Sequence, residues 1–461
     1  MSATTLPRPR KVPRVLILGG GYVGLHVARE IRKRMGRREV AIGLVDPRPY
    51  MTYQPFLPEA AAGSLEPRHV VASHRQFLRG INVLTGRVTA LDHAQRRATI
   101  TPASGPAFSV TYDHVVIALG AVARVLPIPG LAETGVGFKQ VEEAIALRNR
   151  VLTKMDEAAS TWDAEARRRM LTFTFVGGGF AGVEAIGEVE DMAREACRYY
   201  DSIDPGDLRF ILVEGTSRIL PEVGADLGQY ALEQLRQRDI DVHLDTFLNS
   251  CVDGHIELSD GTEFDSDTLV WTAGVKANPV LRDTDLPLDD TGRVRALPTL
   301  QVCTADGEPL EGAWAAGDCA AVPDLSAPGI ATCAPTAQHA IRQAHHLGGN
   351  LTSVLGGGAL EDYNHRNLGT VASLGLYKGV AEVLGLKFRG PLAWFMHRTY
   401  HMTAMPTLNR KVRILLDWTM ALLFRRDIVA LGRLQTPREE FVHAAATSQP
   451  KAATSQPKQS S

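Results

Sequence analysis

The sequence contains the same glycine-rich pattern twice, and each copy lies between a short apolar run and a helical pattern. The first copy, Gly19-Gly-Gly21-Tyr-Val-Gly24, follows Val15–Leu18, and the second, Gly177-Gly-Gly179-Phe-Ala-Gly182, follows Phe173–Val176. In a G-x-G-x-x-G turn the first glycine permits the tight turn, the second lets a pyrophosphate approach the backbone, and the third lets helix and strand pack closely. The pattern predicts two strand–turn–helix units whose free N–H groups bind an anion.

Each unit is followed by a strand that ends in a carboxylate. The strand 41–45 ends at Asp46, and the strand 208–213 ends at Glu214. A carboxylate there accepts hydrogen bonds from the ribose hydroxyls of a dinucleotide, and Glu214 favours NADH because it would repel a 2′-phosphate. One motif alone is a weak signal, since glycine-rich turns also serve packing. Two copies with trailing acids favour two dinucleotide sites, whereas Gly356-Gly-Gly358 follows no strand and predicts a loop.

Two dinucleotide sites in one chain indicate redox relay chemistry. One dinucleotide is held tightly as the relay, and the other exchanges as the electron donor. A flavin with NAD(P)H fits these roles, because a flavin accepts a hydride and passes electrons on singly or in pairs.

Composition excludes several other classes of protein. The 461 residues suggest about three domains, and 50 Lys+Arg against 51 Asp+Glu give a net charge of −1, so no nucleic-acid partner is expected. The five cysteines form no C-x-x-C pair, which argues against a disulfide framework or a metal site and favours a reducing compartment. No apolar run reaches the ~18–20 residues that span a bilayer.

The chain divides into five expected parts, in an α/β fold with two Rossmann-type dinucleotide-binding domains and a C-terminal amphipathic helical segment. Residues 1–12 are Pro- and Arg-rich and flexible. We expect one discontinuous domain over 13–140 and 295–384, a second over 141–294, and a helical segment over 385–435. A connecting helix is expected within 140–166. The polar tail 436–461, in which Ala446–Lys451 recurs at Ala453–Lys458, is expected to be disordered.

These residues resemble those of a known family. The chain is similar to the two-dinucleotide-binding flavoproteins and, among them, to the type II NADH dehydrogenases, the single-subunit NADH:quinone oxidoreductases. The resemblance covers about residues 13–435. Its general marks are the segments 112–120 and 315–318, and its more specific marks are the segments 54–57, 62–63, 271–279 and 335–338.

The resemblance implies a set of cofactor-binding residues. It assigns FAD to Gly19, Gly21, Gly24 and Asp46, with Asp318 on the ribityl chain. It assigns NADH to Gly177, Gly179, Gly182 and Glu214. Tyr22, Gly120, Phe180 and Gly274, which lie within these motifs and segments, complete the expected set. No metal site is expected.

The resemblance also implies a quinone site, with menaquinone or ubiquinone as the acceptor. Glu184 matches a carboxylate near the nicotinamide and the quinone, where it positions substrate or handles protons; the competing interpretation is a Glu favoured at a helix N-terminus. Gln338 matches a quinone-pocket glutamine. The family commonly has Ala-Gln-x-x-x-Gln, but here the second amide position holds Arg342, and Gln343 is expected to point elsewhere on the helix.

The segment 385–434 combines nine basic residues with two acids, a local charge of +7. Leu408, Val412, Leu415, Leu416, Thr419, Leu422 and Leu423 recur at helical spacing, and Pro406 separates two helices. A basic amphipathic helix suits an anionic membrane surface. With the family's membrane anchor in this region, it predicts a peripheral protein on the cytoplasmic side of the cell membrane. A hairpin packed on the body or against a homodimer partner is the alternative.

The expected reaction passes a hydride from NADH to FAD and then two electrons to a membrane quinone, without proton pumping. Two alternatives stay open. One is a soluble NAD(P)H-dependent flavin reductase with another acceptor, which Arg342 keeps open. The other is a flavoprotein redox sensor that uses the basic segment as a docking surface.

Overall fold

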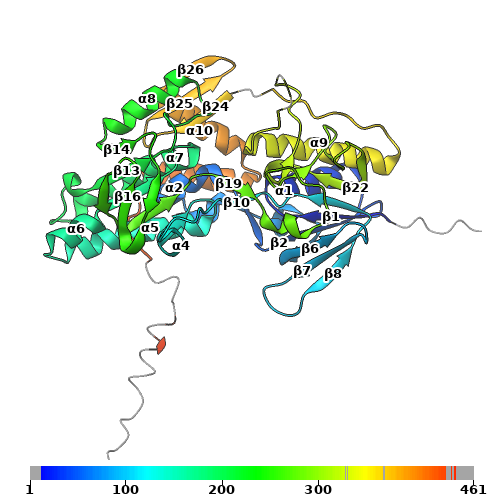
Figure 1. Ribbon diagram of the computed structural model, residues 1–461, viewed down its shortest axis with the longest axis horizontal. Helices are drawn as coiled ribbons and strands as arrows, with labels where there is room; N and C mark the ends of the chain where they lie inside the picture. Colours follow the sequence, from blue (N-terminus) through cyan, green and yellow to red (C-terminus); the bar gives the residue numbers. More distant parts are fainter. Residues whose placement is uncertain are drawn as a thin grey trace, which may run out of the picture.

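The computed structural model describes residues 12–327, 329, 331–366, 369–431, 438 and 441–442. The flexible segment expected at 1–12 lies outside this range except for Val12. Most of the tail expected to be disordered, including its repeat, also lies outside it. The described chain forms two lobes, each built on its own parallel sheet (Figure 1).

The first lobe is built on a six-stranded sheet. Its order is β21-β22-β9-β1-β2-β5, parallel except for β21. The strands are β1 (Arg14–Leu18), β2 (Ala41–Asp46), β5 (Asn82–Thr85), β9 (His114–Ile117), β21 (Gln301–Cys303) and β22 (Pro309–Ala315). Helices α1 (Tyr22–Arg34) and α9 (Ala337–Gly356) pack together on one side of it, and β6 (Arg87–Asp92), β7 (Arg97–Thr101) and β8 (Phe108–Thr111) lie on the other (Figure 1). The apolar run of β1 is buried between these layers.

The second lobe is built on a five-stranded parallel sheet in the order β11-β18-β12-β13-β14. Its strands are β11 (Gly135–Gly137), β12 (Thr172–Val176), β13 (Arg209–Val213), β14 (Ile240–His243) and β18 (Thr268–Trp271). Its helices are α4 (Leu131–Thr134), α5 (Val141–Ala159), α6 (Ala164–Met170), α7 (Phe180–Ala196) and α8 (Ala225–Arg236). The two Rossmann-type sheets confirm the predicted α/β fold class.

The connecting helix expected within 140–166 is two helices, α5 and α6. They separate because Asp163 starts a new helix: its Oδ1 accepts hydrogen bonds from the N–H groups of Glu165 and Ala166. The triple glycine at 356–358 is the end of α9, where Gly357 has φ +76°, and not a loop independent of a helix.

Short elements complete the two lobes. They are β3 (Tyr50–Thr52), η1 (Gln54–Phe56), α2 (Leu57–Ala61), η2 (Pro67–Val70), β4 (Val71–Ser73), α3 (His74–Phe77), β10 (Ala121–Ala123), η3 (Cys197–Tyr199), η4 (Pro205–Asp207), β15 (Leu248–Ser250), η5 (Val252–Gly254), β16 (His255–Leu258), β17 (Glu263–Asp265), β19 (Val275–Ala277), η6 (Pro279–Asp283), β20 (Val294–Arg295), η7 (Gly317–Cys319) and β23 (Ala320–Ala321). The antiparallel pair β10 and β19 joins the two connections between the lobes.

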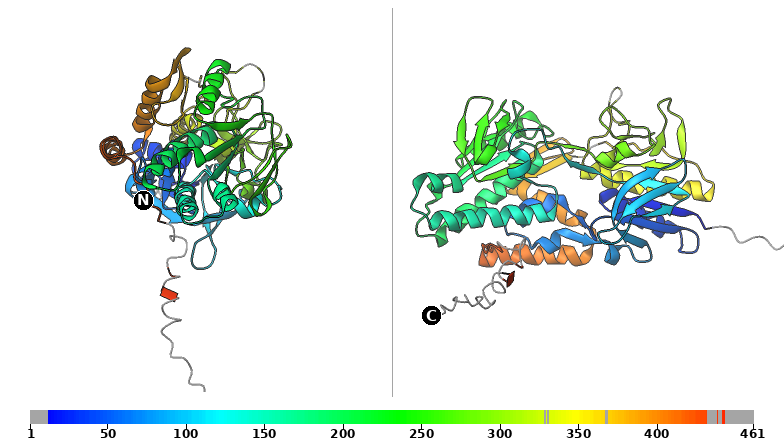
Figure 2. Two further views of the ribbon diagram at one scale, coloured as in Figure 1. Left: turned by 90° about the vertical axis from the view of Figure 1, so that its left-hand side faces the viewer. Right: turned by 60° about the horizontal axis from the view of Figure 1, so that its bottom comes forward.

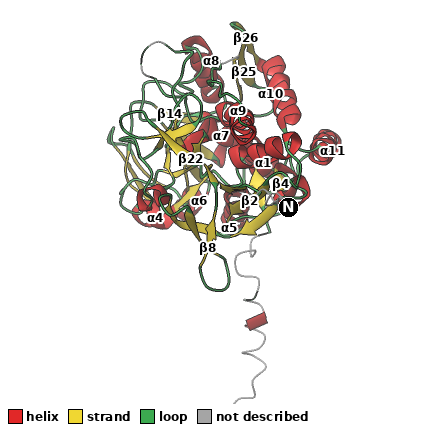
Figure 3. Cartoon of the chain, turned by 90° about the vertical axis from the view of Figure 1, so that its right-hand side faces the viewer, coloured by secondary structure: helices red, strands yellow, loops and turns green. Residues whose placement is uncertain are grey.

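A third layer is formed by the C-terminal residues. The antiparallel sheet of β24 (Gly369–Ser373), β25 (Gly379–Val383) and β26 (Leu386–Arg389) packs on α7 and α8, although the sequence assigned its first two strands to the domain of the first sheet. Helices α10 (Gly390–Ala404) and α11 (Leu408–Phe424) follow along one side of the molecule (Figure 3). Only Ile414 of α11 is buried, and the helix lies at the edge of the body (Figure 2).

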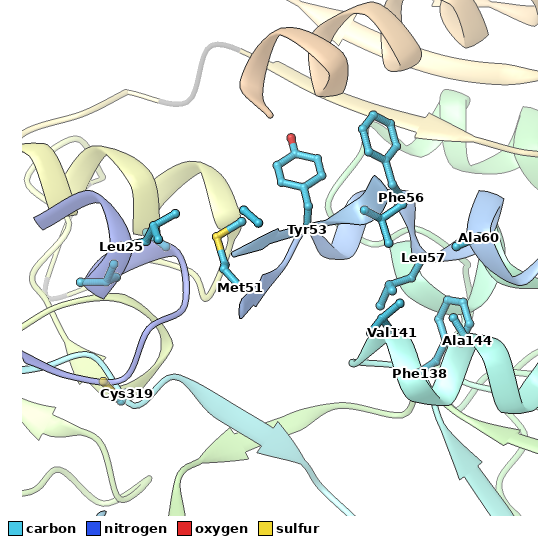
Figure 4. Packing of buried hydrophobic residues seen from close by; sticks show 14 of the residues in the cluster. Leu25, Met51, Tyr53, Phe56, Leu57, Ala60, Phe138, Val141, Ala144 and Cys319 are labelled. Carbon is cyan, nitrogen blue, oxygen red and sulfur yellow. The ribbon is translucent and has the colours of Figure 1, made fainter. Parts of the chain in front are cut away.

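The two lobes share one apolar core. Phe56, Leu57 and Ala60 of η1 and α2 extend from the first lobe and lie beside Phe138 and α5 of the second (Figure 4). Because η1 and α2 also contact α10 and α11 through their side chains, this segment is where both lobes and the C-terminal layer meet.

Candidate functional site

The first glycine loop shows a separate reason for each of its three glycines. Gly19 has φ +103°, and a Cβ there would lie 2.2 Å from the carbonyl oxygen of Ala118. A Cβ on Gly24 would lie 1.8 Å from the carbonyl oxygen of Gly19. Gly21 has nothing within 4 Å of its missing Cβ, so the backbone there is open to a ligand. Open backbone at the first turn of α1 is where a pyrophosphate binds.

The second loop repeats this geometry. Gly177 has φ +114° and lies against the backbone of Thr272. A Cβ on Gly182 would lie 1.9 Å from the carbonyl oxygen of Gly177, while Gly179 again has nothing within 4 Å. Phe180 begins α7, as Tyr22 begins α1. The chain therefore builds the same anion cradle twice.

Both strand-end acids lie against their own loops. Asp46 Oδ2 accepts a hydrogen bond of 2.6 Å from the N–H of Gly20, and Glu214 Oε2 accepts one of 2.5 Å from the N–H of Gly178. The other carboxylate oxygen of Glu214 accepts from the N–H and the hydroxyl of Thr216. The long connection before Glu214 does not displace it, because β13 pairs in register with β12.

A cavity of about 510 Å³ opens beside the first loop. Its volume is in the range of small-molecule and cofactor sites. Six of the residues expected to bind the first cofactor line it: Gly19, Gly21, Tyr22, Asp46, Gly120 and Asp318. Gly24 lies behind the loop, where it allows α1 to approach β1. The open cradle, the acid and the elongated lining fit a dinucleotide.

Lys139 and Gln343 belong to this site, and no motif predicted either of them. Lys139 lines the cavity with its Nζ 3.8 Å from Asp318 Oδ2. Burial lowers the pKa of Lys139, and Asp318 partly opposes this effect. The Oε1 atom of buried Gln343 accepts a hydrogen bond of 2.8 Å from the N–H of Gly317, next to Asp318. Gln343 thus points at the cavity wall, in a different direction from Arg342, as its place on the helix predicts.

Gly120 and Gly274 directly precede β10 and β19, the antiparallel pair of strands between the lobes. Gly120 has φ +63° and its carbonyl accepts from the N–H of Asn278, while Gly274 has φ +90° and its carbonyl accepts from the N–H of Arg124. The indole of Trp271 also donates to the carbonyl of Arg124. Gly274 lies outside the lining of the cavity beside the first loop.

The three residues expected at the quinone site lie in two separate parts of the structure. Glu184 is buried in α7, where its Oε1 accepts from the N–H of Ser373 at 2.9 Å and lies 3.0 Å from His397 Nε2. Gln338 and Arg342 lie together in the first turns of α9. The guanidinium of Arg342 donates to the carbonyl of Gln338 at 3.3 Å. Burial lowers the pKa of His339 and of His365, and the charge of Arg342 adds to this effect.

A buried cluster of charges lies beneath the C-terminal helices. Glu59 of α2 lies 3.2 Å from Arg398 and accepts a hydrogen bond from the indole of Trp418. Glu188 of α7 lies 3.2 Å from Arg426. Burial raises the pKa of Glu188, against the opposing charge of Arg426. Two of the nine cations expected to face lipid are therefore inside the protein, because α2 and α7 supply buried carboxylates that need partners.

None of the five cysteines has the character of a reactive thiolate. All five are buried and unpaired. Cys319 is the one next to Asp318, and burial raises its pKa to about 12. Its Sγ is directed at the carbonyls of Ile117 and Ala316. A thiol held protonated in this way does not serve as a nucleophile or redox dithiol at neutral pH.

The described residues contain neither a cluster of metal ligands nor a helix that could span a membrane. No three His, Cys, Asp or Glu side chains gather there as a metal site; His339 and His346 both contact the ring of Tyr363. In the same part of the chain, none of the helices combines the length and apolar character needed to cross a bilayer.

Comparison with known proteins agrees with this geometry. Residues 13–344 match the pyridine nucleotide-disulphide oxidoreductase family. The chain is 30% identical over 469 residues to the type II NADH:quinone oxidoreductase Ndh of Mycobacterium tuberculosis, covering 97% of both chains. It is 28% identical to an internal alternative NAD(P)H-ubiquinone oxidoreductase of Arabidopsis thaliana, covering 90% of this chain and 85% of the relative.

The fold has a solved counterpart. The structure of NDH2 from Plasmodium falciparum in complex with NADH superposes with a TM-score of 0.83 at 17% identity, over 91% of this chain and all of that one. The duplicated loops, the family match and the near full-length relative agree. This chain belongs to the type II NADH:quinone oxidoreductases, FAD-dependent members of the pyridine nucleotide-disulphide oxidoreductase family.

Proposed function

We propose that this chain oxidises NADH at the second glycine loop and passes the electrons, through FAD in the cavity beside the first loop, to a quinone at a membrane surface. The observation that carries the proposal is the duplicated cradle, with open backbone at Gly21 and Gly179 and a carboxylate on each loop. One cradle serves a resident cofactor and the other an exchangeable donor. The names of the full-length relatives support the quinone as acceptor.

In this proposal, the first lobe holds the flavin. The N–H groups at the start of α1 bind the pyrophosphate, Asp46 binds the ribose, and Asp318 binds the ribityl chain, with Gly120 and Tyr22 in the cavity wall. FAD supplies hydride acceptance and electron transfer when bound. Lys139 places its Nζ next to Asp318, and Gln343 fixes the Gly317 backbone beside it.

The second lobe holds NADH. Gly177, Gly179 and Gly182 form its cradle at the start of α7, which Phe180 begins. Glu214 accepts from the ribose hydroxyls and selects against a 2′-phosphate. Gly274 directly precedes β19, in the antiparallel pair of β10 and β19 between the lobes, and its missing side chain leaves room for NADH there. We assign FAD to residues 13–140 and 295–384, and NADH to residues 141–294.

The quinone approaches from the side of the C-terminal helices. Glu184 lies there against α10, and Gln338 is the second residue of α9. Arg342, which replaces the family's second amide, acts indirectly by holding the carbonyl of Gln338. Whether menaquinone or ubiquinone is preferred depends on side chains around this approach.

The segment 385–435 is proposed to lie on the membrane through apolar contact. Eight apolar side chains of α11 are exposed: Leu408, Val412, Leu415, Leu416, Met420, Leu422, Leu423 and Phe424. These include six of the seven residues that form the apolar pattern in the sequence. On α10, Leu392 and Phe395 add to them. Such a surface fits the boundary between headgroups and acyl chains on the cytoplasmic side, or a second copy of the chain.

Electrostatic attraction adds little in this proposal, since many of the local cations are already paired. Arg398 and Arg426 are buried on carboxylates, Lys387 and Arg389 pair with Asp226, and Arg410 donates to a backbone carbonyl. Each unpaired surface cation adds only about 1 kcal/mol on an anionic membrane. Binding should therefore persist at high salt.

Vesicle flotation of the purified holoenzyme tests the membrane part. With phosphatidylglycerol–phosphatidylethanolamine vesicles, we expect flotation at both 0.15 and 0.5 M salt, and its loss in the double variant Leu416→Glu/Leu423→Glu. Val252→Glu, a change at an apolar side chain exposed on the second lobe, is the matched control. Wild-type protein that stays in the lower fraction would favour a soluble reductase, and slow turnover with every quinone would favour a redox sensor.

A further inference from the structure

Two histidines on one face of α10 connect a buried carboxylate with a buried phenol. His397 Nε2 lies 3.0 Å from Glu184 Oε1, and His401 Nδ1 lies 3.1 Å from the hydroxyl of Tyr53. The two imidazole rings are one helical turn apart, with centroids separated by 4.5 Å. The hydroxyl of Tyr53 points toward α10 (Figure 4). Four side chains from three parts of the chain thus form one continuous series.

The series ends beside the dinucleotide cavity. The ring of Tyr53 packs edge-on against Tyr22, at 5.9 Å between centroids, and Tyr22 lines the cavity. The hydroxyl of Tyr22 accepts a hydrogen bond from the N–H of Gln54, another lining residue. Only one aromatic ring therefore separates the histidine pair from the cavity wall.

The position of His397 is unusual for a residue that serves packing alone. Its side chain is 2% exposed. Its Nε2 lies 3.0 Å from Glu184 Oε1 without a hydrogen bond of good geometry, and its Nδ1 has no hydrogen-bond partner among the described residues. A buried nitrogen without a partner costs about 1–3 kcal/mol unless a water or a moving proton uses it. A simple ion pair with Glu184 would not need this atom, and it would not need a second histidine in contact.

The two rings differ in protonation. Burial lowers the pKa of His397, but Glu184 and, to a smaller extent, Glu59 outweigh it, so the net shift is upward in spite of Arg398. Burial and the charge of His397 lower the pKa of His401 well below its usual range. Of the two rings, His397 therefore holds a proton more readily and His401 less readily than an ordinary histidine. A donor and an acceptor of the same proton lie side by side.

We propose that His397 and His401 form a proton relay between Glu184 and Tyr53, through which α10 delivers the proton that quinone reduction consumes. The inference rests on the proposed function, because the overall reaction NADH + H⁺ + quinone → NAD⁺ + hydroquinone takes up one proton per turnover. The hydride of NADH carries two electrons and one hydrogen nucleus to the hydroquinone, and the relay supplies the second hydrogen nucleus.

The steps balance with one proton. The imidazolium of His397 breaks an N–H bond, and His401 gains one; a ring rotation or one bridging water closes the gap between them. His401 Nδ1–H then gives its proton to the oxygen of Tyr53 as the phenol O–H gives its own proton to an oxygen of the quinone that is being reduced. His397, now neutral, is reprotonated from the medium, and the carboxylate of Glu184 stabilises the imidazolium that forms again. Glu184 acts as a positioning residue for His397, and Tyr53 is the last member of the relay.

Separate half-reactions of the holoenzyme test the relay. His401→Gln keeps an amide near Tyr53 but cannot carry a proton, and Tyr53→Phe removes only the hydroxyl. In stopped-flow experiments we expect flavin reduction by NADH within about twofold of wild type in both variants. Reoxidation by a short-chain quinone should fall about 100-fold in His401→Gln, the size of a lost general acid. Its solvent deuterium isotope effect should rise.

The matched control is His255→Gln, a change at a half-exposed histidine of β16 on the second lobe. It should leave both half-reactions unchanged. Equal slowing of reduction and reoxidation in His401→Gln and Tyr53→Phe, with lower melting temperatures, would show a structural role and overturn the relay. Normal reoxidation in both variants would overturn it as well.

A readout independent of turnover is the ¹⁵N spectrum of the imidazole nitrogens in histidine-labelled oxidised holoenzyme. One imidazolium should persist above pH 7 and vanish in His397→Gln, and one neutral ring should persist at pH 5 and vanish in His401→Gln. Two ordinary histidine titrations would contradict the proposal. If wild-type protein reduces no quinone, the proposed function fails first; if it turns over and the variants match it, only the relay fails.

Discussion

Asp46 and Glu214 are structural counterparts. Asp46 is the last residue of β2 and Glu214 directly follows β13, and each carboxylate accepts a hydrogen bond from the middle N–H of its own glycine loop. In both loops the following glycine is open on the side where a ligand approaches. Each acid therefore orders its own loop and is placed to accept hydrogen bonds from the ribose hydroxyls of a dinucleotide.

Glu214→Ala should weaken NADH binding and relax the choice between NADH and NADPH. The variant loses a charged acceptor, worth about 1.5–3 kcal/mol, so the KM for NADH should rise about 10-fold or more. The KM for NADPH should fall, because the 2′-phosphate no longer meets a carboxylate. Steady-state kinetics with both nucleotides check this, with Glu222→Ala, an exposed acid, as the control. An unchanged ratio of the two KM values would remove Glu214 from the donor site.

Arg426→Ala should destabilise the protein strongly. The change leaves Glu188, which is fully buried, without the guanidinium that lies 3.2 Å from it. Removing one partner of a buried ion pair costs about 3–5 kcal/mol. Thermal unfolding of the holoenzyme measures the loss. Arg413→Ala, a change at an exposed residue of α11 whose guanidinium donates to Asn409, should have little effect. Equal melting temperatures of the two variants would refute the account of the buried cluster.

Arg342→Gln, which restores the family's amide, should change the KM for quinone by less than about threefold. The guanidinium lies on the carbonyl of Gln338 and outside the lining of the cavity, so its charge does not meet the reacting groups directly. Quinone titrations at saturating NADH provide the measurement, with Gln338→Ala in parallel as the variant expected to raise the quinone KM. A large gain or loss in Arg342→Gln alone would place Arg342 against the quinone.

Acid should destabilise the first lobe through His26. Burial, with smaller effects of His345 and Arg29, lowers the pKa of His26 to about 4. The unfolded chain therefore binds this proton from about pH 6.5, whereas the folded chain does not, so the stabilisation present above pH 6.5 is lost as the pH falls toward 4. The loss amounts to about 3 kcal/mol. In urea unfolding, His26→Leu should flatten this acid dependence.

The control for His26 is a histidine whose pKa is shifted in the opposite direction. His255 is half-exposed, and the carboxylate of Asp265 raises its pKa, so any contribution is present at low pH and fades as the pH rises. His255→Gln should leave the acid limb of the stability curve as it is in wild type. A curve for His26→Leu that coincides with wild type from pH 7 to 4 would contradict the assignment.

The parts of the fold and site that the sequence predicted are those encoded within a few residues. Gly19, Gly24 and Asp46 carry their roles in their spacing, because a strand, a tight turn and a helix follow one another without a break. The two α/β sheets follow from the same repeat. Lys139 and Gln343 have no such spacing. Lys139 reaches the cavity from the residues just before α5, and Gln343 reaches it because α9 packs on α1 and η7.

The C-terminal segment shows why the sequence could not predict the remaining contacts of the site. Its charges indicate a basic face, yet the partners of Arg398 and Arg426 are Glu59 and Glu188, which are more than 200 residues away along the chain. The same holds for His401 and Tyr53. Which cations face lipid and which are buried depends on these distant pairings, and composition cannot distinguish them.

The central claim is tested most directly by anaerobic stopped-flow spectroscopy of the yellow holoenzyme. The protein is mixed with NADH while the flavin absorbance is followed, and then with a short-chain menaquinone or ubiquinone analogue. The account predicts rapid bleaching, reoxidation by the quinone, and many cycles of NADH oxidation when both substrates are present. Bleaching by NADH without reoxidation by any quinone would contradict it.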